Sequence, residues 1–157
     1  LEELRKKVMH VLGQKSIFNT TSDGMDMALS VIEKTTKKMQ FSGAFNPMIC
    51  IRDKELIEVK GDRMPVGIYP KMENSFETHN VQLESNDTIY LFSDGYADQF
   101  GGKKGRKFLT KNLKHLLQEI STLPTDEQKV ILENTLNNWQ GELSQVDDIL
   151  VIGFRIA

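Results

Sequence analysis

Three segments of the chain carry apolar residues at the intervals of three and four that are typical of amphipathic helices. The first extends over 1–12 and the second over 109–120. The third begins near Thr125, which with Gln128 three residues later fits a capping box, and it ends at Gly141. These stripes predict three helices, each with one buried face.

Short apolar runs, typical of strands, fill most of the chain between the first two helices. We expect strands at six places, over 27–32, 38–41, 47–51, 56–59, 76–83 and 87–92. A last apolar run over 148–154 predicts a strand that is buried on both faces. Because short turns such as 52–54 join successive strands, the pairing should be mostly antiparallel.

This order of elements, with strands grouped together and helices grouped together, favours the α+β class over alternating α/β. Two packed sheets flanked by helices, an α/β/β/α sandwich, would bury the strands that are apolar on both faces. The length of 157 residues fits one domain, and 39% hydrophobic with 27% charged residues is an ordinary globular composition.

Charge and cysteine content exclude several classes of protein. The net charge of −2 shows no excess of positive charge of the kind that nucleic-acid-binding proteins carry. The single cysteine, Cys50, excludes a disulfide framework and indicates a reducing compartment, so a cytoplasmic location is expected. No apolar run approaches the roughly 20 residues that span a bilayer, so we expect no membrane segment.

Two places combine carboxylates with the ends of apolar strands. Asp94 follows the run 87–92 and precedes a glycine, and Asp147 and Asp148 precede the last strand. Each place taken alone also fits a strand-end or solvated acidic turn. If the two strands lie side by side, Asp94 and Asp147 converge, and carboxylates without histidine neighbours suit magnesium or manganese better than zinc.

Five segments of the chain resemble, in order, those of the phosphatase domain of stage II sporulation protein E (SpoIIE). This family is the bacterial branch of the metal-dependent PPM, or type 2C-like, protein phosphatases. The two most specific segments contain the carboxylates described above. The five are Asp23 to Leu29, Phe41 to Pro47, Met64 to Ile68, Leu91 to Gly102 and Gln145 to Gly153.

The resemblance implies a β-sandwich with a two-metal site for Mn²⁺ or Mg²⁺, in which a metal-bound hydroxide attacks phosphoserine or phosphothreonine and no protein nucleophile is needed. It assigns Asp94 and Asp147 as metal ligands. Asp148 either orients its neighbour or supports an extra metal. Ser93 and Gly95 shape the turn, while Asp98 and Gln99 lie beside the ligands or serve the surface.

One family motif is absent: a strand ending in Gly-Asp followed by Gly-His-Gly, whose aspartate bridges both metals. We therefore expect residues 1–157 to be one partial domain, truncated at its N-terminus, whose missing strands and first metal motif lie upstream of Leu1. The parent protein would dephosphorylate a bacterial regulatory protein, for example an anti-sigma-factor antagonist, while the fragment would be weakly active or inactive.

Further partners and alternative functions follow from the same expectation. Sensory or repeat domains would lie upstream in the parent chain, and strand edges left open would promote self-association. The alternative to an enzyme is a non-catalytic phosphoprotein-binding or signalling scaffold with the same fold. A receiver-type phosphoacceptor also clusters aspartates, but it requires strands and helices that alternate, and this chain does not show them.

Overall fold

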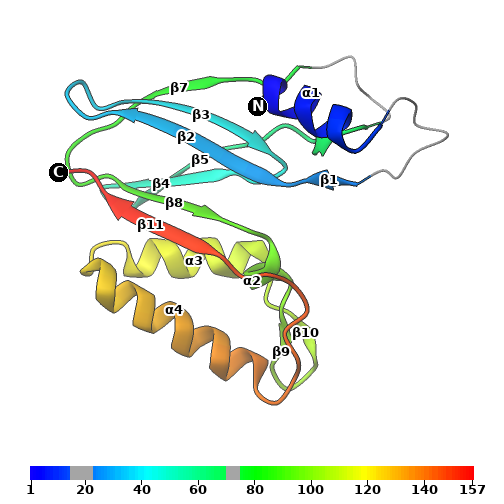
Figure 1. Ribbon diagram of the computed structural model, residues 1–157. Helices are drawn as coiled ribbons and strands as arrows, with labels where there is room; N and C mark the ends of the chain where they lie inside the picture. The colour runs from blue at the N-terminus through cyan, green and yellow to red at the C-terminus, as the bar shows by residue number, and fades with distance from the viewer. Residues whose placement is uncertain (15–22, 70–74) are drawn as a thin grey trace. The chain divides into compact units, whose positions relative to one another are not determined.

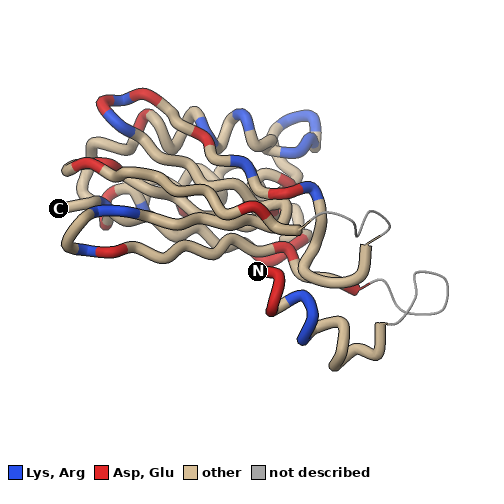
Figure 2. The backbone as a smooth tube through the Cα atoms, turned by 90° about the horizontal axis from the view of Figure 1, so that it is seen from above, with Lys and Arg blue, Asp and Glu red and all other residues tan. Residues whose placement is uncertain are grey.

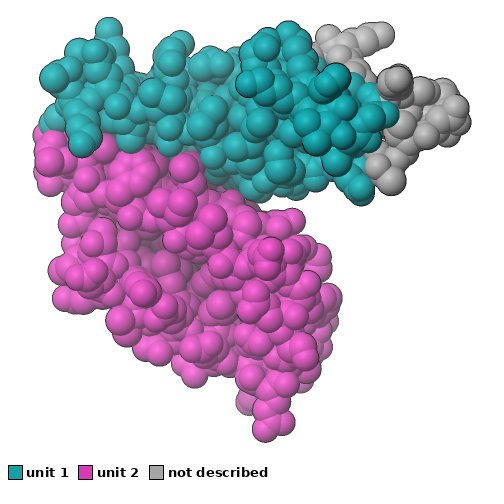
Figure 3. Space-filling view, viewed as in Figure 1, with its two compact units in different colours: residues 1–48, 59–83 teal, residues 49–58, 84–157 magenta. Residues whose placement is uncertain are grey.

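A computed structural model of the chain describes residues 1–14, 23–69 and 75–157 (Figure 1). These residues form two compact units, coloured separately in Figure 3. Unit 1 comprises Leu1–Met48 and Val59–Leu83, and unit 2 comprises Ile49–Glu58 and Glu84–Ala157. The polar stretch from Thr20 to Gly24, whose composition is typical of a loop, lies partly outside the described residues.

Unit 1 consists of one helix and two small antiparallel sheets. Its elements are α1 (Glu2–Val11), β1 (Gly24–Met25), β2 (Met27–Glu33), β3 (Lys38–Ala44), β6 (Val66–Gly67) and β7 (His79–Gln82). The larger sheet has the order β2-β3-β7, and β1 pairs with β6. Side chains alternate in the first half of β3, where Lys38 and Gln40 are exposed and Met39 is buried, and every residue from Phe41 to Ala44 is buried.

Helix α1 is attached to the rest of unit 1 near both of its ends. The buried Arg5 side chain places its Nη1 3.3 Å from the sulfur of Met64. Beyond the C-terminal end of the helix, the Gln14 side chain donates to the carbonyl of Asp23 at 2.6 Å and accepts from the N–H of Ile68 at 2.9 Å. The helix predicted over 1–12 is confirmed.

Unit 2 consists of a four-stranded sheet, a small hairpin and three helices. Its elements are β4 (Met48–Arg52, from Ile49 on), β5 (Glu55–Val59, up to Glu58), β8 (Thr88–Phe92), α2 (Gly95–Asp98), β9 (Phe100–Gly101), β10 (Arg106–Lys107), α3 (Thr110–Ile120), α4 (Thr125–Gln140) and β11 (Val151–Arg155). The sheet order is β11-β8-β4-β5. Helices α3 and α4 lie on one face of this sheet (Figure 1).

The core of unit 2 joins the sheet to the helices. Aromatic rings dominate its centre: Phe108 packs edge-to-face on both Tyr96 and Trp139, with centroids 5.2 and 5.5 Å apart. Leu113 and Leu117 from α3 are fully buried in the same cluster. The apolar stripe predicted over 109–120 is therefore the buried face of α3, except for Leu109, which precedes the helix and is 55% exposed.

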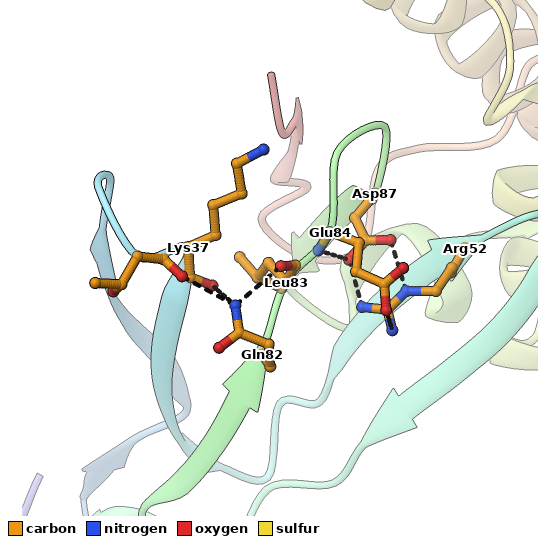
Figure 4. A network of polar contacts seen from close by, with 7 residues as sticks. Lys37, Arg52, Gln82, Leu83, Glu84 and Asp87 are labelled. Atoms are coloured by element: carbon orange, nitrogen blue, oxygen red, sulfur yellow. Dashed lines mark hydrogen bonds and ion pairs between the residues drawn. The ribbon is translucent and has the colours of Figure 1, made fainter.

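In unit 2, an ion pair joins Arg52, the last residue of β4, to Asp87, which directly precedes β8 (Figure 4). The Arg52 guanidinium donates from Nε to Oδ1 of Asp87 at 2.9 Å and from Nη2 to Oδ2 at 2.7 Å. The N–H of Glu84 also donates to Oδ2, at 2.8 Å. Burial alone would raise the pKa of Asp87, but these hydrogen bonds outweigh it and hold the pKa below its usual range.

Two other polar features, one in each unit, have structural roles. Burial raises the pKa of the neighbouring Cys50 thiol to about 11, so this cysteine is a packed, un-ionised side chain. Within unit 1, Gln82 donates to the carbonyls of Thr36 at 2.9 Å and Leu83 at 3.2 Å, which ties the end of β7 to the β2–β3 turn (Figure 4).

The predicted α+β class with antiparallel pairing is confirmed, but two local predictions are wrong. Thr125 and Gln128 form no capping box: the helix N-cap is Pro124 without a side-chain cap, and Gln128 turns inward to accept from the Tyr90 hydroxyl at 2.7 Å. The last strand is not buried on both faces, because β11 is the edge strand of its sheet and Ile152 is 47% exposed.

Candidate metal-binding site

Asp94 lies where the buried strand β8 passes into the short helix α2. The strand ends at Phe92, and Asp94 is the N-cap residue of α2. Its side chain is exposed and makes no hydrogen bond or ion pair with another residue in the described part of the chain. A rigid strand therefore positions a carboxylate that remains available to a ligand.

Ser93 joins this turn to the segment that carries the other two carboxylates. Strands β8 and β11 pair antiparallel with Phe92 opposite Val151, and the Ser93 N–H extends the ladder by donating to the carbonyl of Leu150 at 3.0 Å. The Ser93 hydroxyl donates to the carbonyl of Asp148 at 2.7 Å and accepts from the N–H of Leu150 at 3.0 Å. These three bonds bring Asp94 and the residues just before Leu150 to the same end of the sheet.

Gly95 is required by the close approach of the second segment. A Cβ at this position would lie 2.9 Å from the carbonyl carbon of Asp148 and closer still to its oxygen. The backbone φ of Gly95 is not in the left-handed region, so conformational freedom is not the reason for glycine here. Glycine at this position therefore permits contact between two backbones.

Asp147 and Asp148 lie in the exposed loop before β11, not in the strand. The N–H of Asp148 donates to Oδ1 of Asp147 at 2.7 Å, and the Gln145 side chain donates to the carbonyl of Asp147 at 2.7 Å. The backbone of Asp148 therefore orients the carboxylate of Asp147.

The donor chemistry of this site fits a hard divalent cation, but the number of donors does not complete a site. Asp94 and Asp147 offer exposed carboxylate oxygens at the joined ends of two strands, as Mg²⁺ and Mn²⁺ prefer. Yet residues 1–14, 23–69 and 75–157 contain no group of three or more His, Cys, Asp or Glu side chains that could hold a metal ion. The described residues supply part of a metal site.

Asp98 and Gln99 lie beside the candidate ligands in different environments. Asp98 is half-exposed and forms an ion pair of 2.7 Å with Lys107. Gln99 is fully buried and donates to the carbonyl of Ser144 at 3.0 Å, which ties α2 to the loop that leads to Asp147. Sequence reasoning missed Lys107, although four cationic residues in the five positions 103–107 were a visible signal.

A groove of about 500 Å³ runs along α4 in unit 2, lined mainly by apolar side chains that include Tyr90, Leu132 and Val151. None of the three candidate aspartates lines it. The carboxylates therefore lie on open surface at the end of the sheet. No helix in the described part of the chain is both long and apolar enough to cross a membrane.

Comparison with known proteins identifies a consistent set of relatives. The family model described as "Stage II sporulation protein E (SpoIIE)" matches residues 1–157. No match to the chain is found among the curated proteins. Among solved structures, the SiaA-PP2C domain of Pseudomonas aeruginosa superposes with a TM-score of 0.86 at 27% sequence identity, over 98% of this chain and 58% of that one.

Two further solved structures share the fold at lower identity. The phosphatase domain of the cell-fate determinant SpoIIE from Bacillus subtilis, presoaked with Mn, has a TM-score of 0.64 at 20% identity, over 97% of this chain and 63% of that one. The PPM Ser-Thr phosphatase MsPP from Mycobacterium smegmatis, in complex with cacodylate, has a TM-score of 0.65 at 12% identity, over 99% and 71%. The chain thus spans less than two thirds of the length of the Pseudomonas and Bacillus domains.

Proposed function

This chain belongs to the SpoIIE family of PPM serine/threonine phosphatase domains, and on that premise we propose that it supplies part of a metal-dependent active site that hydrolyses phosphoserine or phosphothreonine. The observation that carries the proposal is the Ser93 hydroxyl, which bonds Asp148 at 2.7 Å and Leu150 at 3.0 Å and so joins the two aspartate segments. A purely structural turn does not require exposed carboxylates on both of the segments that it joins.

In the proposed site, Asp94 and Asp147 hold divalent cations, Mn²⁺ or Mg²⁺. Such metals, when bound, activate water for in-line attack and neutralise the phosphoryl oxygens. Ser93 and Gly95 set the spacing of the two segments, and the N–H of Asp148 holds Oδ1 of Asp147 at 2.7 Å, which fixes the direction of that carboxylate. Asp148 thus positions its neighbour through its backbone.

The remaining ligands of the site come from a part of the full-length protein outside these residues. Two observations support this step: the described residues include no three-ligand cluster, and the chain covers 58% of the Pseudomonas domain. We therefore expect the 157-residue chain alone to show little turnover. The proposed substrate is a phosphorylated bacterial regulatory protein, such as an anti-sigma-factor antagonist, in the cytoplasm.

The test is the Asp94→Asn substitution in the full-length protein, assayed with Mn²⁺ on a phosphoserine peptide. We expect turnover to fall by at least about 100-fold, because the amide cannot replace a charged ligand, while the melting temperature without metal stays nearly unchanged, because Asp94 is exposed. Asp126→Asn, an exposed aspartate at the start of α4, is the matched control and should leave turnover intact.

Two results would count against the proposal. Turnover that survives Asp94→Asn would remove this residue from the metal site, and turnover by the isolated chain at the full-length rate would show that no further ligand is needed. A non-catalytic phosphoprotein-binding module is the second candidate, favoured by the incomplete ligand set. It predicts phosphopeptide binding by the full-length protein without any turnover.

A further inference from the structure

A strongly basic hairpin follows α2 and is not explained by the metal site. Strands β9 and β10 pair antiparallel, with Gly101 opposite Arg106. The connecting turn and β10 carry Lys103, Lys104, Arg106 and Lys107, four cations in five positions. All four side chains are exposed. Figure 2 marks the lysine and arginine positions in blue along the backbone.

Most of this charge is not neutralised by the protein itself. Lys107 forms an ion pair of 2.7 Å with Asp98. Lys103, Lys104 and Arg106 have no ion-pair or hydrogen-bond partner among residues 1–14, 23–69 and 75–157. A run of exposed cations is often only a solvated surface, so a function for this one requires evidence that it is held in place.

The hairpin is held rigidly on the core of unit 2. The N–H of Gly102 donates to the carbonyl of Trp139 at 2.7 Å, and the N–H of Phe108 donates to the carbonyl of Gln99 at 3.0 Å. Gly101 lies so close to the backbone of Trp139 that no side chain would fit there. The backbone at both ends of the hairpin is therefore fixed, and it holds Lys103, Lys104 and Arg106 together on one part of the surface of unit 2.

The hairpin also lies next to the candidate metal site. The N–H of Asp98 donates to the carbonyl of Asp94 at 2.9 Å, one helical turn apart, and Lys107 pairs with Asp98. Figure 1 shows α2 beside the hairpin, with the chain between α4 and β11 passing close to both. A phosphoprotein bound at Asp94 would therefore extend its neighbouring residues over or close to these cations.

We propose that the β9–β10 hairpin is a docking surface for an acidic segment of the phosphoprotein substrate, close in sequence to its phosphorylated residue. This inference rests on the proposed phosphatase function. Three free cations on one fixed hairpin suit a short run of Asp or Glu. A nucleic acid is usually bound along a longer positively charged groove with several stacking aromatic side chains, whereas this hairpin carries one exposed aromatic side chain, Phe100 of β9.

The test measures kcat/KM of the full-length protein for three substrates. The unsubstituted protein is compared with a variant that carries the triple substitution Lys103→Ser, Lys104→Ser and Arg106→Ser. The substrates are p-nitrophenyl phosphate, a phosphoserine peptide with acidic flanks and the same peptide with neutral flanks. Lys107 is kept because it pairs with Asp98. The control variant removes three exposed lysines of unit 1, Lys34, Lys38 and Lys60, and so matches the change in net charge.

We expect kcat/KM for the acidic peptide to fall about fivefold to tenfold in the hairpin variant, mainly through KM, since exposed charge pairs are individually weak and screened by salt. The neutral peptide, p-nitrophenyl phosphate and the control variant should show no change. In the unsubstituted protein, added salt should reduce kcat/KM for the acidic peptide alone.

Each other outcome is decisive. Normal turnover of p-nitrophenyl phosphate with an unchanged acidic peptide would overturn the docking surface and leave the phosphatase function standing. An absence of turnover on all three substrates in the unsubstituted protein would overturn the phosphatase function and this inference with it. Loss of single-stranded RNA binding with unchanged peptide kinetics would assign the hairpin to nucleic acid and also overturn the inference.

Discussion

The Gly95→Ala substitution isolates the contact that joins the two halves of the candidate site. An alanine Cβ would lie 2.9 Å from the carbonyl carbon of Asp148, and the carbonyl oxygen is closer still. Both neighbours are backbone atoms, so no side chain can rotate away. To reach an ordinary separation of about 3.5 Å, the Asp148 peptide would have to withdraw by roughly 0.5–1 Å.

That displacement has a predictable size in stability and in function. Overpacking of this kind costs about 1–3 kcal/mol, which for a domain of this length lowers the melting temperature by roughly 2–12 °C. It also weakens the 2.7 Å bond from the Ser93 hydroxyl to Asp148 and moves Asp147 relative to Asp94. Misplacement of reacting groups by about 1 Å commonly costs about 100-fold in rate.

The assay measures Mn²⁺-dependent turnover and the melting temperature of the full-length protein side by side. Gly153→Ala is the matched control, because its added Cβ would meet only the ring of Tyr90, at 3.1 Å, and no backbone atom of the aspartate segments. We expect a large loss of turnover for Gly95→Ala and near-normal turnover for Gly153→Ala. Unchanged turnover and stability in Gly95→Ala would refute the claim that the two backbones are in contact.

Two further substitutions test the core of unit 2. Asp87→Asn should destabilise the fold by about 2–3 kcal/mol at pH 7, less than a fully buried pair because Arg52 is 27% exposed. Since the folded pKa of Asp87 is depressed, its carboxylate stabilises the fold above the unfolded pKa of about 3.9 and loses that effect as pH falls through the folded value. The difference in the free energy of unfolding between the unsubstituted protein and Asp87→Asn, measured in urea, should therefore narrow below about pH 4. A constant difference from pH 7 to pH 3 would contradict a stabilising role for the Asp87 carboxylate. Tyr90→Phe should cost about 1–2 kcal/mol in the same unfolding experiment, because it leaves the buried Oε1 of Gln128 without its 2.7 Å donor; wild-type stability would show that this bond contributes nothing.

The features that were predictable from sequence are those with a long or simple local pattern. Helix α3 follows from the recurrence of leucines such as Leu113 and Leu117, and the β4–β5 turn follows from a polar break between apolar runs. Two residues of that turn, Asp53 and Lys54, adopt positive φ, as tight hairpins require. Strands of two residues, such as β1, β6, β9 and β10, carry no period and were not predicted.

The errors arise where distant parts of the chain decide the outcome. Gln128 is placed correctly for a capping box, but the hydroxyl of Tyr90, 38 positions away in sequence, draws it into the core. The burial of β11 depends on its place at the edge of the sheet, which no local pattern reports. The pairing of Lys107 with Asp98 depends likewise on the path of the hairpin.

Because of the antiparallel register of β8 and β11, the candidate site should tolerate insertions and deletions in one part of the chain before β11 and not in another. Phe92 pairs with Val151, so the positions of Asp94 and Asp147 depend on the number of residues that separate each of them from that pair. One inserted or deleted residue between Asp148 and Val151 would move Asp148 away from the contacts that it makes with Ser93 and Gly95. Residues 141–143 precede Ser144, whose carbonyl accepts from Gln99, and they lie on the surface, so related proteins should differ in length there first.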